Sequence, residues 1–587
     1  MRIGTIFLLL ITVIGISAPA SPPPKPLTQA NILQLLKGGV ASGRVAKLVK
    51  GRGIDFEPTD DFIESLRQAG GKDDLVAALA TAKRAAPASP DMAAQVKEHL
   101  DHAQQMAING DHDGAISESR QAVQIDSRNS EAHATLAVGF LLKGDYESAL
   151  QECHEAEQLD PHNGNAPANC AWTLYRSGKA DEASPELHRA LELAPTSPHV
   201  HFVAALGALQ QGNTDDAVAE CHKALELDPN NFGAHVTLAA ALNMQKKYDE
   251  GAQEARAALR LAPRNSDAHS MLGWSLRDKG NLEEAGKEVR AAMELDANNG
   301  QAHEVLASIL LLQKKPDDAL PEAREAVRLE PNNSWAHERL AWALNLEGKL
   351  DEALVEGREA VRLAPQIGDN HMMVGWALSQ KGDHAAALVE YREALRLDSN
   401  NAWYHISAAW ELVTLAKNDE AIVEARAAIR IDPKNSDLYP PLAQALISKG
   451  DLEGSLAQSR EALRLNPNNA LAHIDAAWAL LGQNQPDAAR PDLDAVLNAD
   501  PNYHLAHYHL AWYYIQKKQP DQAIVQARLA VDEQPNTPYY HNMLGWALEA
   551  KGDPQGALQE YRAGYLLLPS DPGLKANYER LLNQVKK

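Results

Sequence analysis

Residues 266–299 read SDAHSMLGWSLRDKGNLEEAGKEVRAAMELDANN, and variants of this 34-residue pattern follow one another fourteen times, without a gap, from residue 96 to residue 571. We number the positions of each repeat as places 1 to 34, so that place 1 is residue 96 in repeat 1 and residue 266 in repeat 6. Place 8 is always Ala or Gly, place 27 is Ala in twelve repeats, and place 32 is usually Pro. A fixed period of this length indicates a stacked array of small structural units.

Each repeat has the pattern of two helices joined by a turn. Places 4, 7, 8 and 11 fall on one stripe of a first helix, and places 20, 24 and 27 on one stripe of a second. A Gly such as Gly280 ends the first helix, and the proline at place 32 ends the second. Small residues at places 8 and 20 allow the two helices to approach closely. One such hairpin cannot bury its apolar stripe alone, so we expect the repeats to stack.

The repeat resembles the tetratricopeptide repeat family in its characteristic positions. The residues of repeat 6 that carry this resemblance are His269, Leu272, Gly273, Ala285, Ala292 and, in place of the usual proline, Ala297. The resemblance implies an all-α fold, a right-handed superhelical solenoid of helix-turn-helix repeats closed by a C-terminal capping helix. It does not define a function, because members of the family bind unrelated partners.

The N-terminus has the pattern of a secretory signal. Arg2 precedes an apolar run over residues 3–16, and Ala18 and Ala20 suit cleavage after residue 20. We therefore expect a periplasmic or secreted protein, with an uncleaved N-terminal anchor as the alternative. The predicted division is a signal peptide at 1–20, a Pro-rich spacer at 21–26, a small helical module at 27–82, an Ala/Pro linker at 83–95, the repeats at 96–571 and a capping helix at 572–587. The module resembles one found beside repeat arrays in bacterial proteins.

The charge balance argues against two classes of partner. The chain holds 56 Lys and Arg against 79 Asp and Glu, a net charge of −23, and the excess of negative charge lies entirely after residue 95. Nucleic acid and anionic membranes are themselves negative, so we expect neither as a partner. We expect no membrane span in the mature chain.

Histidine occupies place 4 in twelve repeats, yet we do not expect a metal site. Equivalent places on stacked helices are separated by about 8–10 Å, too far for ring nitrogens that must each lie about 2.0–2.1 Å from a shared zinc ion. Place 23 is Glu in eleven repeats, and where place 4 is Tyr439, place 23 is Gln458. We therefore predict a hydrogen bond between the place-4 imidazole and the place-23 carboxylate.

The three cysteines, Cys153, Cys170 and Cys221, fall at packing places. We expect buried thiols, and the alternative is a Cys153–Cys170 disulfide in an oxidising compartment. The sequence shows no nucleophile, acid/base or phosphate-binding motif, so we expect neither enzymatic activity nor a cofactor.

Tryptophan is the most informative residue type for function. Eight of the ten Trp residues are at place 9 and the other two at place 2, on a stripe that in the family lines the inner, concave groove. Aromatic residues dominate binding hot spots. Each Trp could instead pack against the neighbouring first helix and stabilise the superhelix, and both roles are compatible. The candidate binding residues are Trp335, Trp342, Trp376, Trp403, Trp410, Trp478, Tyr508, Trp512, Tyr539 and Trp546.

We thus predict a non-enzymatic protein–protein interaction scaffold of the cell envelope that binds an extended or apolar peptide segment. One alternative is a glycan-binding scaffold, since stacked indole faces also suit sugar rings. Another is a spacer whose specific contact lies in residues 27–82. The sequence leaves the oligomeric state open.

Overall fold

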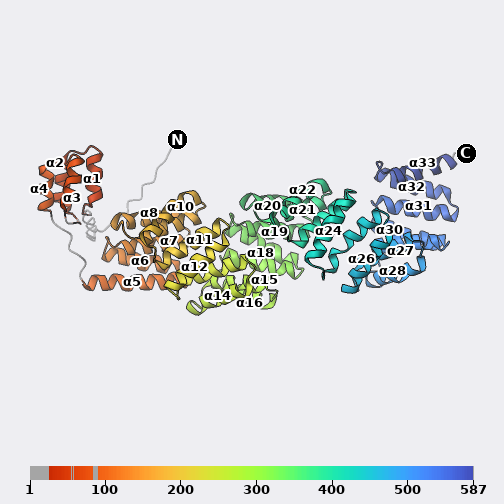
Figure 1. Ribbon diagram of the computed structural model, residues 1–587, viewed down its shortest axis with the longest axis horizontal. Coiled ribbons are helices and arrows are strands. Elements are labelled where there is room, and N and C mark those ends of the chain that lie inside the picture. The colour runs from red at the N-terminus through yellow and green to blue at the C-terminus, as the bar shows by residue number, and fades with distance from the viewer. Residues whose placement is uncertain (1–25, 55, 57, 83–89, 586–587) are drawn as a thin grey trace, which may run out of the picture. The chain divides into compact units, whose positions relative to one another are not determined.

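The computed structural model describes residues 26–54, 56, 58–82 and 90–585. Within these residues it contains 33 α-helices and one 3-10 helix, no strand, and a single isolated β-bridge between Leu27 and Ile54 (Figure 1). The helices form two compact units, residues 1–265 and 266–587. The predicted fold class, an all-α solenoid of helical hairpins, is confirmed. The predicted signal segment lies outside the described residues.

Four short helices precede the repeats: α1 (Gln29–Lys37), α2 (Ser42–Arg52), α3 (Asp60–Gln68) and α4 (Asp73–Ala80). The helices α1 and α3 begin at side-chain caps, since Thr28 accepts a hydrogen bond from Asn31 N and Thr59 accepts one from Phe62 N. Apolar residues from all four helices form one buried cluster. This cluster gives the segment a core of its own.

The first unit continues with five helical hairpins, repeats 1 to 5, whose first and second helices alternate along the chain (Figure 1). The helices are α5 (Pro90–Ile108), α6 (His112–Ile125), α7 (Ser130–Lys143), α8 (Tyr146–Leu159), α9 (Asn165–Arg176), α10 (Ala180–Leu193), α11 (Pro198–Gln210), α12 (Thr214–Leu227), α13 (Phe232–Met244) and α14 (Tyr248–Leu261).

The second unit contains repeats 6 to 14 and the last helix of the chain. Its helices are α15 (Ser266–Asp278), α16 (Leu282–Leu295), α17 (Gly300–Leu312), α18 (Pro316–Leu329), α19 (Ser334–Leu346), α20 (Leu350–Leu363), α21 (Gly368–Gln380), α22 (His384–Leu397), α23 (Ala402–Thr414), α24 (Asn418–Ile431), α25 (Pro440–Ser448), α26 (Leu452–Leu465), α27 (Ala470–Gly482), α28 (Pro486–Ala499), α29 (His504–Gln516), α30 (Pro520–Glu533), α31 (Pro538–Lys551), α32 (Pro554–Leu567) and α33 (Pro572–Val585). No helix of the described residues combines the length and the apolar character that a membrane crossing requires.

Helix boundaries follow from side-chain caps and one special turn residue. Asn299, at place 34, accepts a hydrogen bond from Ala302 N and so caps the first helix of the next repeat, while its Nδ2 atom donates to Ser266 Oγ at 2.7 Å. The turn inside each hairpin needs a left-handed residue, and Gly280 supplies it with φ of 89°. In repeat 11, Pro440 and Pro441 shorten the first helix to α25, which a 3-10 turn at Ser436–Leu438 precedes.

The core of each hairpin depends on complementary sizes at places 8 and 24. A Cβ atom at Gly375 would lie 2.6 Å from the Tyr391 ring, and one at Gly273 would lie 2.5 Å from Val289 Cγ2. These distances are shorter than any real contact, so glycine makes room for a large residue on the second helix. Elsewhere a smaller residue at place 24, such as Ala323, faces an alanine at place 8.

Candidate functional site

The place-4 histidines bind the second helix of their own repeat, as predicted. In all twelve repeats Nδ1 of the histidine lies 2.6 to 2.8 Å from a side-chain oxygen at place 23. The pairs are His99–Glu118, His133–Glu152, His201–Glu220, His235–Glu254, His269–Glu288, His303–Glu322, His337–Glu356, His371–Glu390, His405–Glu424, His473–Asp492, His507–Gln526 and His541–Glu560. The histidines are therefore structural.

The same rings also bind the preceding repeat. In ten repeats Nε2 donates to the backbone carbonyl of place 32 of the repeat before, at 2.8 to 3.3 Å, as in His337 to Pro331 O. Hydrogen bonds to Glu254, Glu424 and Asp492 raise the pKa values of His235, His405 and His473 above the usual 6.5. In these ten repeats the imidazole thus joins three segments of chain, and in His235, His405 and His473 the carboxylate bond favours the charged form.

Two of the three cysteines are not thiols, which corrects the expectation of three buried thiols. Cys153 on α8 and Cys170 on α9 form a disulfide, with their Cα atoms 5.7 Å apart. The disulfide links the second helix of repeat 2 to the first helix of repeat 3. Cys221 is a free, buried cysteine, and burial raises the pKa of its thiol to about 12.

The only group of three metal-ligating side chains in the described part of the chain is Cys153, His154 and Cys170. Two of its three sulfur and nitrogen donors are in the disulfide. A disulfide sulfur is not the thiolate that zinc requires, so the group as it stands is not a zinc site.

All ten candidate binding residues lie on first helices of the second unit, and none of them is fully buried. Trp403, Tyr539 and Trp546 are 51%, 47% and 40% exposed. The other seven are partly buried. These ten aromatic side chains, at places 2, 5 and 9, lie on the first helices of repeats 8 to 10 and 12 to 14, with none on α25 of repeat 11, and we call them the aromatic face.

Several of the partly buried rings also pack against the core. Trp342 contacts the buried cluster around Leu340 and Leu344, and Trp512 contacts two clusters, including the one around Leu544. The two roles considered from the sequence are thus combined in single side chains: one side of the ring packs and another faces solvent. The structure does not identify a ligand for this face.

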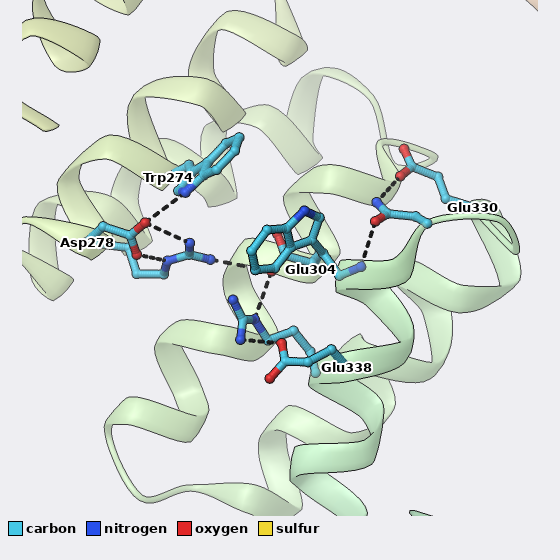
Figure 2. A network of polar contacts seen from close by, with 9 residues as sticks. Trp274, Asp278, Glu304, Glu330 and Glu338 are labelled. Atoms are coloured by element: carbon cyan, nitrogen blue, oxygen red, sulfur yellow. Dashed lines mark hydrogen bonds and ion pairs between the residues drawn. The ribbon is translucent and has the colours of Figure 1, made fainter. Parts of the chain in front are cut away.

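A network of buried charges lies beside the aromatic face in repeats 6 to 8 (Figure 2). Glu304 Oε1 accepts hydrogen bonds from Arg339 Nε at 2.9 Å and from Arg277 Nη1 at 3.4 Å, and Arg339 also forms an ion pair with Glu338. Asp278 and Glu338 lie on either side of Glu304 in Figure 2. All of these residues except Asp278 are less than 10% exposed. None of these residues was among the candidate site residues, although charged residues at places 5, 6 and 12, which are usually apolar or small, are a visible signal in the sequence.

The network holds three tryptophans in position. The guanidinium of Arg339 lies 5.6 Å from the ring centre of Trp335 and 5.9 Å from that of Trp342. Trp274 Nε1 donates to Asp278 Oδ2 at 2.8 Å. Cation–π and hydrogen-bonding contacts fix ring orientation without covering the whole ring. Burial raises the pKa of Glu338 to about 7, because the two arginines compensate its charge only in part.

A second cluster of rings occupies repeats 12 to 14. Tyr508 lies next to His509 and Tyr540, with ring centres 4.9 and 5.4 Å away, and the His509 ring lies 5.5 Å from Trp478. His504 Nδ1 and the Tyr540 hydroxyl are 2.5 Å apart. Complete burial lowers the pKa of His509 to about 4, so this ring is neutral at physiological pH. The cluster joins three successive first helices through aromatic contacts.

A separate hollow of about 610 Å³ lies between α6 and α7, on residues of repeats 1 and 2. Arg120 covers the Phe140 ring at 5.2 Å, and Lys143 pairs with Asp113 at 2.5 Å. Three of its polar lining residues, Arg120, Lys143 and Asp113, are thus engaged in contacts between the two repeats.

Stacked helical hairpins with a 34-residue period define a helical repeat protein. The sequence matches the tetratricopeptide repeat family over residues 140–206, 208–254, 238–302, 271–334, 305–366, 369–401 and 480–547. The chain belongs to this family. Its members are generally non-catalytic scaffolds that bind proteins or peptides, and the chain is accordingly a protein–protein interaction scaffold.

Comparison with solved structures finds similar chains at low sequence identity. A chain of the APC/C hetero-tetramer Cut9-Hcn1 is 14% identical, with a TM-score of 0.47 over 84% of this chain and 97% of that one. The human IFIT1 dimer, solved with PPP-AAAA and with m7Gppp-AAAA, is 18% identical, with a TM-score of 0.40 over 69% of this chain and 99% of that one. No curated protein matches the sequence significantly.

Proposed function

We propose that the chain is an exported scaffold that binds an extended, largely apolar polypeptide segment on the aromatic face of repeats 8 to 14. The observation that carries the proposal is the partial exposure of Trp and Tyr at places 2, 5 and 9 on the first helices of six of these seven repeats, all but repeat 11. Large rings that are held in place and still reach solvent lose little entropy on binding, which favours their use as contact points.

The neighbouring charges support a protein ligand. Asp278 of repeat 6, the exposed member of the charge network, places a carboxylate beside Trp274 near the start of the aromatic face, so that a segment with both apolar side chains and backbone hydrogen-bonding groups finds partners there. An extended peptide presents both along its length. A glycan is the second candidate, since Trp403 and Trp546 expose 51% and 40% of their surface, and flat exposed rings stack on sugars.

The Cys153–Cys170 disulfide supports export, because such bonds persist in oxidising compartments. The apolar run and small residues of segment 1–20 agree with this location. N-terminal sequencing of the chain isolated from the producing cell tests whether it is exported and cleaved. We expect the mature chain to begin at Ser21 and to be recovered outside the cytoplasm; an intact Met1 in the cytoplasmic fraction would overturn it.

The binding proposal is tested by affinity capture from an envelope extract with three exposed rings removed, in the variant Trp403→Ala/Tyr539→Ala/Trp546→Ala. A matched control, Leu227→Ala/Met244→Ala, removes exposed apolar side chains of the first unit that are 46% and 39% exposed. We expect the control to retain a polypeptide partner that the aromatic variant loses. Equal capture by both would contradict the proposal, and selective loss of a polysaccharide would favour the glycan candidate.

A further inference from the structure

The second helices of repeats 7 to 13 carry an unbroken row of exposed apolar residues at place 22. The row consists of Pro321, Val355, Val389, Val423, Ala457, Pro491 and Val525. The four valines are 65%, 64%, 62% and 55% exposed. In repeats 1, 2, 5 and 6 the same place holds Ser117, Gln151, Gln253 and Lys287, and in repeats 3 and 4 it holds Pro185 and Ala219. Valine at this place is therefore confined to the second unit, and we call the seven residues of repeats 7 to 13 the place-22 row.

The stability of the single chain does not account for these valines. A β-branched side chain lowers helix propensity relative to the Ala, Glu, Lys or Gln that usually occupy exposed helix positions. A valine that remains about 60% exposed buries little surface against its own chain. Isolated exposed apolar residues are common, but the same one at the same place of three consecutive repeats is not isolated.

Charged bands flank the row on both sides in repeats 8 to 10. The band one turn before the row, at places 18 and 19, is acidic in repeats 8 and 10 and holds Ala385 and Ala386 in repeat 9, and the bands one and two turns after it, at places 25 and 29, are basic in all three repeats. The acidic residues are Asp351, Glu352, Asp419 and Glu420, and the basic residues are Arg358, Arg362, Arg392, Arg396, Arg426 and Arg430. Because one turn of helix spans about 5.4 Å, the acidic band and the place-25 band lie about one turn from the row, and the place-29 band lies about two turns from it.

The local charge of this face is balanced, unlike that of the chain. Glu356, Glu390 and Glu424 are bonded to histidines inside the hairpins. The remaining carboxylates of α20, α22 and α24 are the four of the acidic band together with Glu359 and Glu393, six in all, and they face six arginines. A chain of net charge −23 thus carries one apolar face that a like-charged copy can approach without net repulsion.

We propose that a second copy of this chain docks on the place-22 row, related to the first by a two-fold axis that runs along the row. This axis brings valines onto valines, and it sets the acidic band of each copy opposite the arginine band of the other on both sides. The facing helices then run antiparallel, which also opposes their dipoles. A two-fold axis parallel to the helices would instead set like charges opposite each other, so charge complementarity selects the first arrangement.

The arginines are able to change partners. Arg392 Nη2 donates to Glu420 Oε2 at 2.6 Å and Arg324 Nη2 to Glu352 Oε2 at 3.1 Å, between neighbouring repeats of one chain. The side chains of the first pair are each 53% exposed. Exposed ion pairs of this kind contribute little to stability, so an approaching copy can share or replace them at small cost.

The proposal is tested by sedimentation velocity of the purified full chain over a wide concentration range. We expect a reversible dimer in the wild type, and association weaker by roughly 100-fold in the variant Val355→Ser/Val389→Ser/Val423→Ser, since each copy loses three buried apolar side chains. The control Leu227→Ser/Met244→Ser removes exposed apolar surface elsewhere and should associate as the wild type does. A wild type that is monomeric at every concentration, or a serine variant that dimerises as the wild type does, overturns the proposal.

A charge exchange tests the direction of the axis. One variant reverses the place-25 arginines, as Arg358→Glu/Arg392→Glu/Arg426→Glu. The other reverses the acidic band, as Asp351→Arg/Glu352→Arg/Asp419→Arg/Glu420→Arg. We expect each variant alone to be monomeric and an equal mixture of the two to form heterodimers. Circular dichroism checks that both charge variants are folded. If either is unfolded, the sedimentation measurements on the wild type and on the serine variant decide whether the chain dimerises through the place-22 row. Two folded variants that remain monomeric when mixed overturn the proposed arrangement.

Discussion

His337 donates hydrogen bonds from both ring nitrogens, from Nδ1 to Glu356 Oε2 at 2.6 Å and from Nε2 to Pro331 O at 3.0 Å. A neutral imidazole has only one N–H group, so a ring that faces two acceptors favours the doubly protonated, cationic form. The same arrangement recurs in nine other repeats. Folding raises the pKa values of His235, His337, His405 and His473 above the usual 6.5, which links the stability of these repeats to pH.

We predict that the melting temperature is highest near pH 6 and falls by several degrees as the pH rises to about 8.5. The pKa values of His235, His405 and His473 lie above the usual 6.5 in the folded chain because carboxylates accept their hydrogen bonds. A group whose pKa is raised by folding stabilises the fold below its unfolded pKa, and this contribution is lost as the pH rises through the folded pKa. Differential scanning calorimetry at several pH values measures the effect.

Added salt provides the control for this prediction. General repulsion among acidic side chains also grows with pH, but salt screens exposed charges far more than paired, partly buried ones. If the pH dependence of the melting temperature persists at high salt, it arises from the paired histidines. If it disappears at high salt, it arises from repulsion between exposed surface charges. A melting temperature that stays level or rises between pH 6 and 8.5 contradicts the prediction.

Repeat 11 shows how the same position is filled without a charge. Tyr439 replaces the histidine, its hydroxyl donates to Pro433 O at 2.8 Å, and Gln458 replaces the glutamate. We predict that His337→Ala lowers the free energy of unfolding by about 2 kcal/mol, because two hydrogen bonds are lost and Glu356 is left unpaired. The double variant His337→Tyr/Glu356→Gln should lose less than half as much. Urea unfolding at pH 6 compares them; a double variant no more stable than His337→Ala would refute this.

The place-4 pairing could be predicted because the repeats vary together. The change from His to Tyr439 coincides with the change from Glu to Gln458, and such a coincidence between two places indicates contact. The helical hairpins themselves could be predicted because every repeat contains the same small residues and turn signals.

The charge network of repeats 6 to 8 could not be predicted in this way. Arg277, Glu304 and Arg339 come from three different first helices and occupy three different places. No period in the sequence relates them, so only the packing of successive repeats shows that they meet. The disulfide had the same difficulty: places 24 and 7 are both packing places, and only the structure brings Cys153 and Cys170 within bonding distance.

We predict that Arg339→Met destabilises the chain by about 3 kcal/mol, because Glu304 and Glu338 remain buried while losing their shared cation. The control Arg362→Met removes an exposed arginine of the same repeat that pairs with Glu359, and it should cost less than about 1 kcal/mol. Trp335 and Trp342 should emit at longer wavelength in the Arg339 variant as their rings loosen. Equal unfolding midpoints for the two variants in urea would show that the network is not stabilising.

Thiol counting distinguishes the disulfide from three free cysteines. We predict that no thiol of the native, unreduced chain reacts with a thiol reagent, because Cys221 is buried and its pKa is raised to about 12. Unfolding without reductant should expose one thiol, and unfolding with reductant three. Reduction should also lower the free energy of unfolding by about 3 kcal/mol, because the bond closes a loop of 17 residues in the unfolded chain. The variant Cys153→Ser/Cys170→Ser should reproduce this loss and no longer respond to reductant. Three reactive thiols in the unfolded, unreduced wild type would contradict the disulfide and remove its support for export.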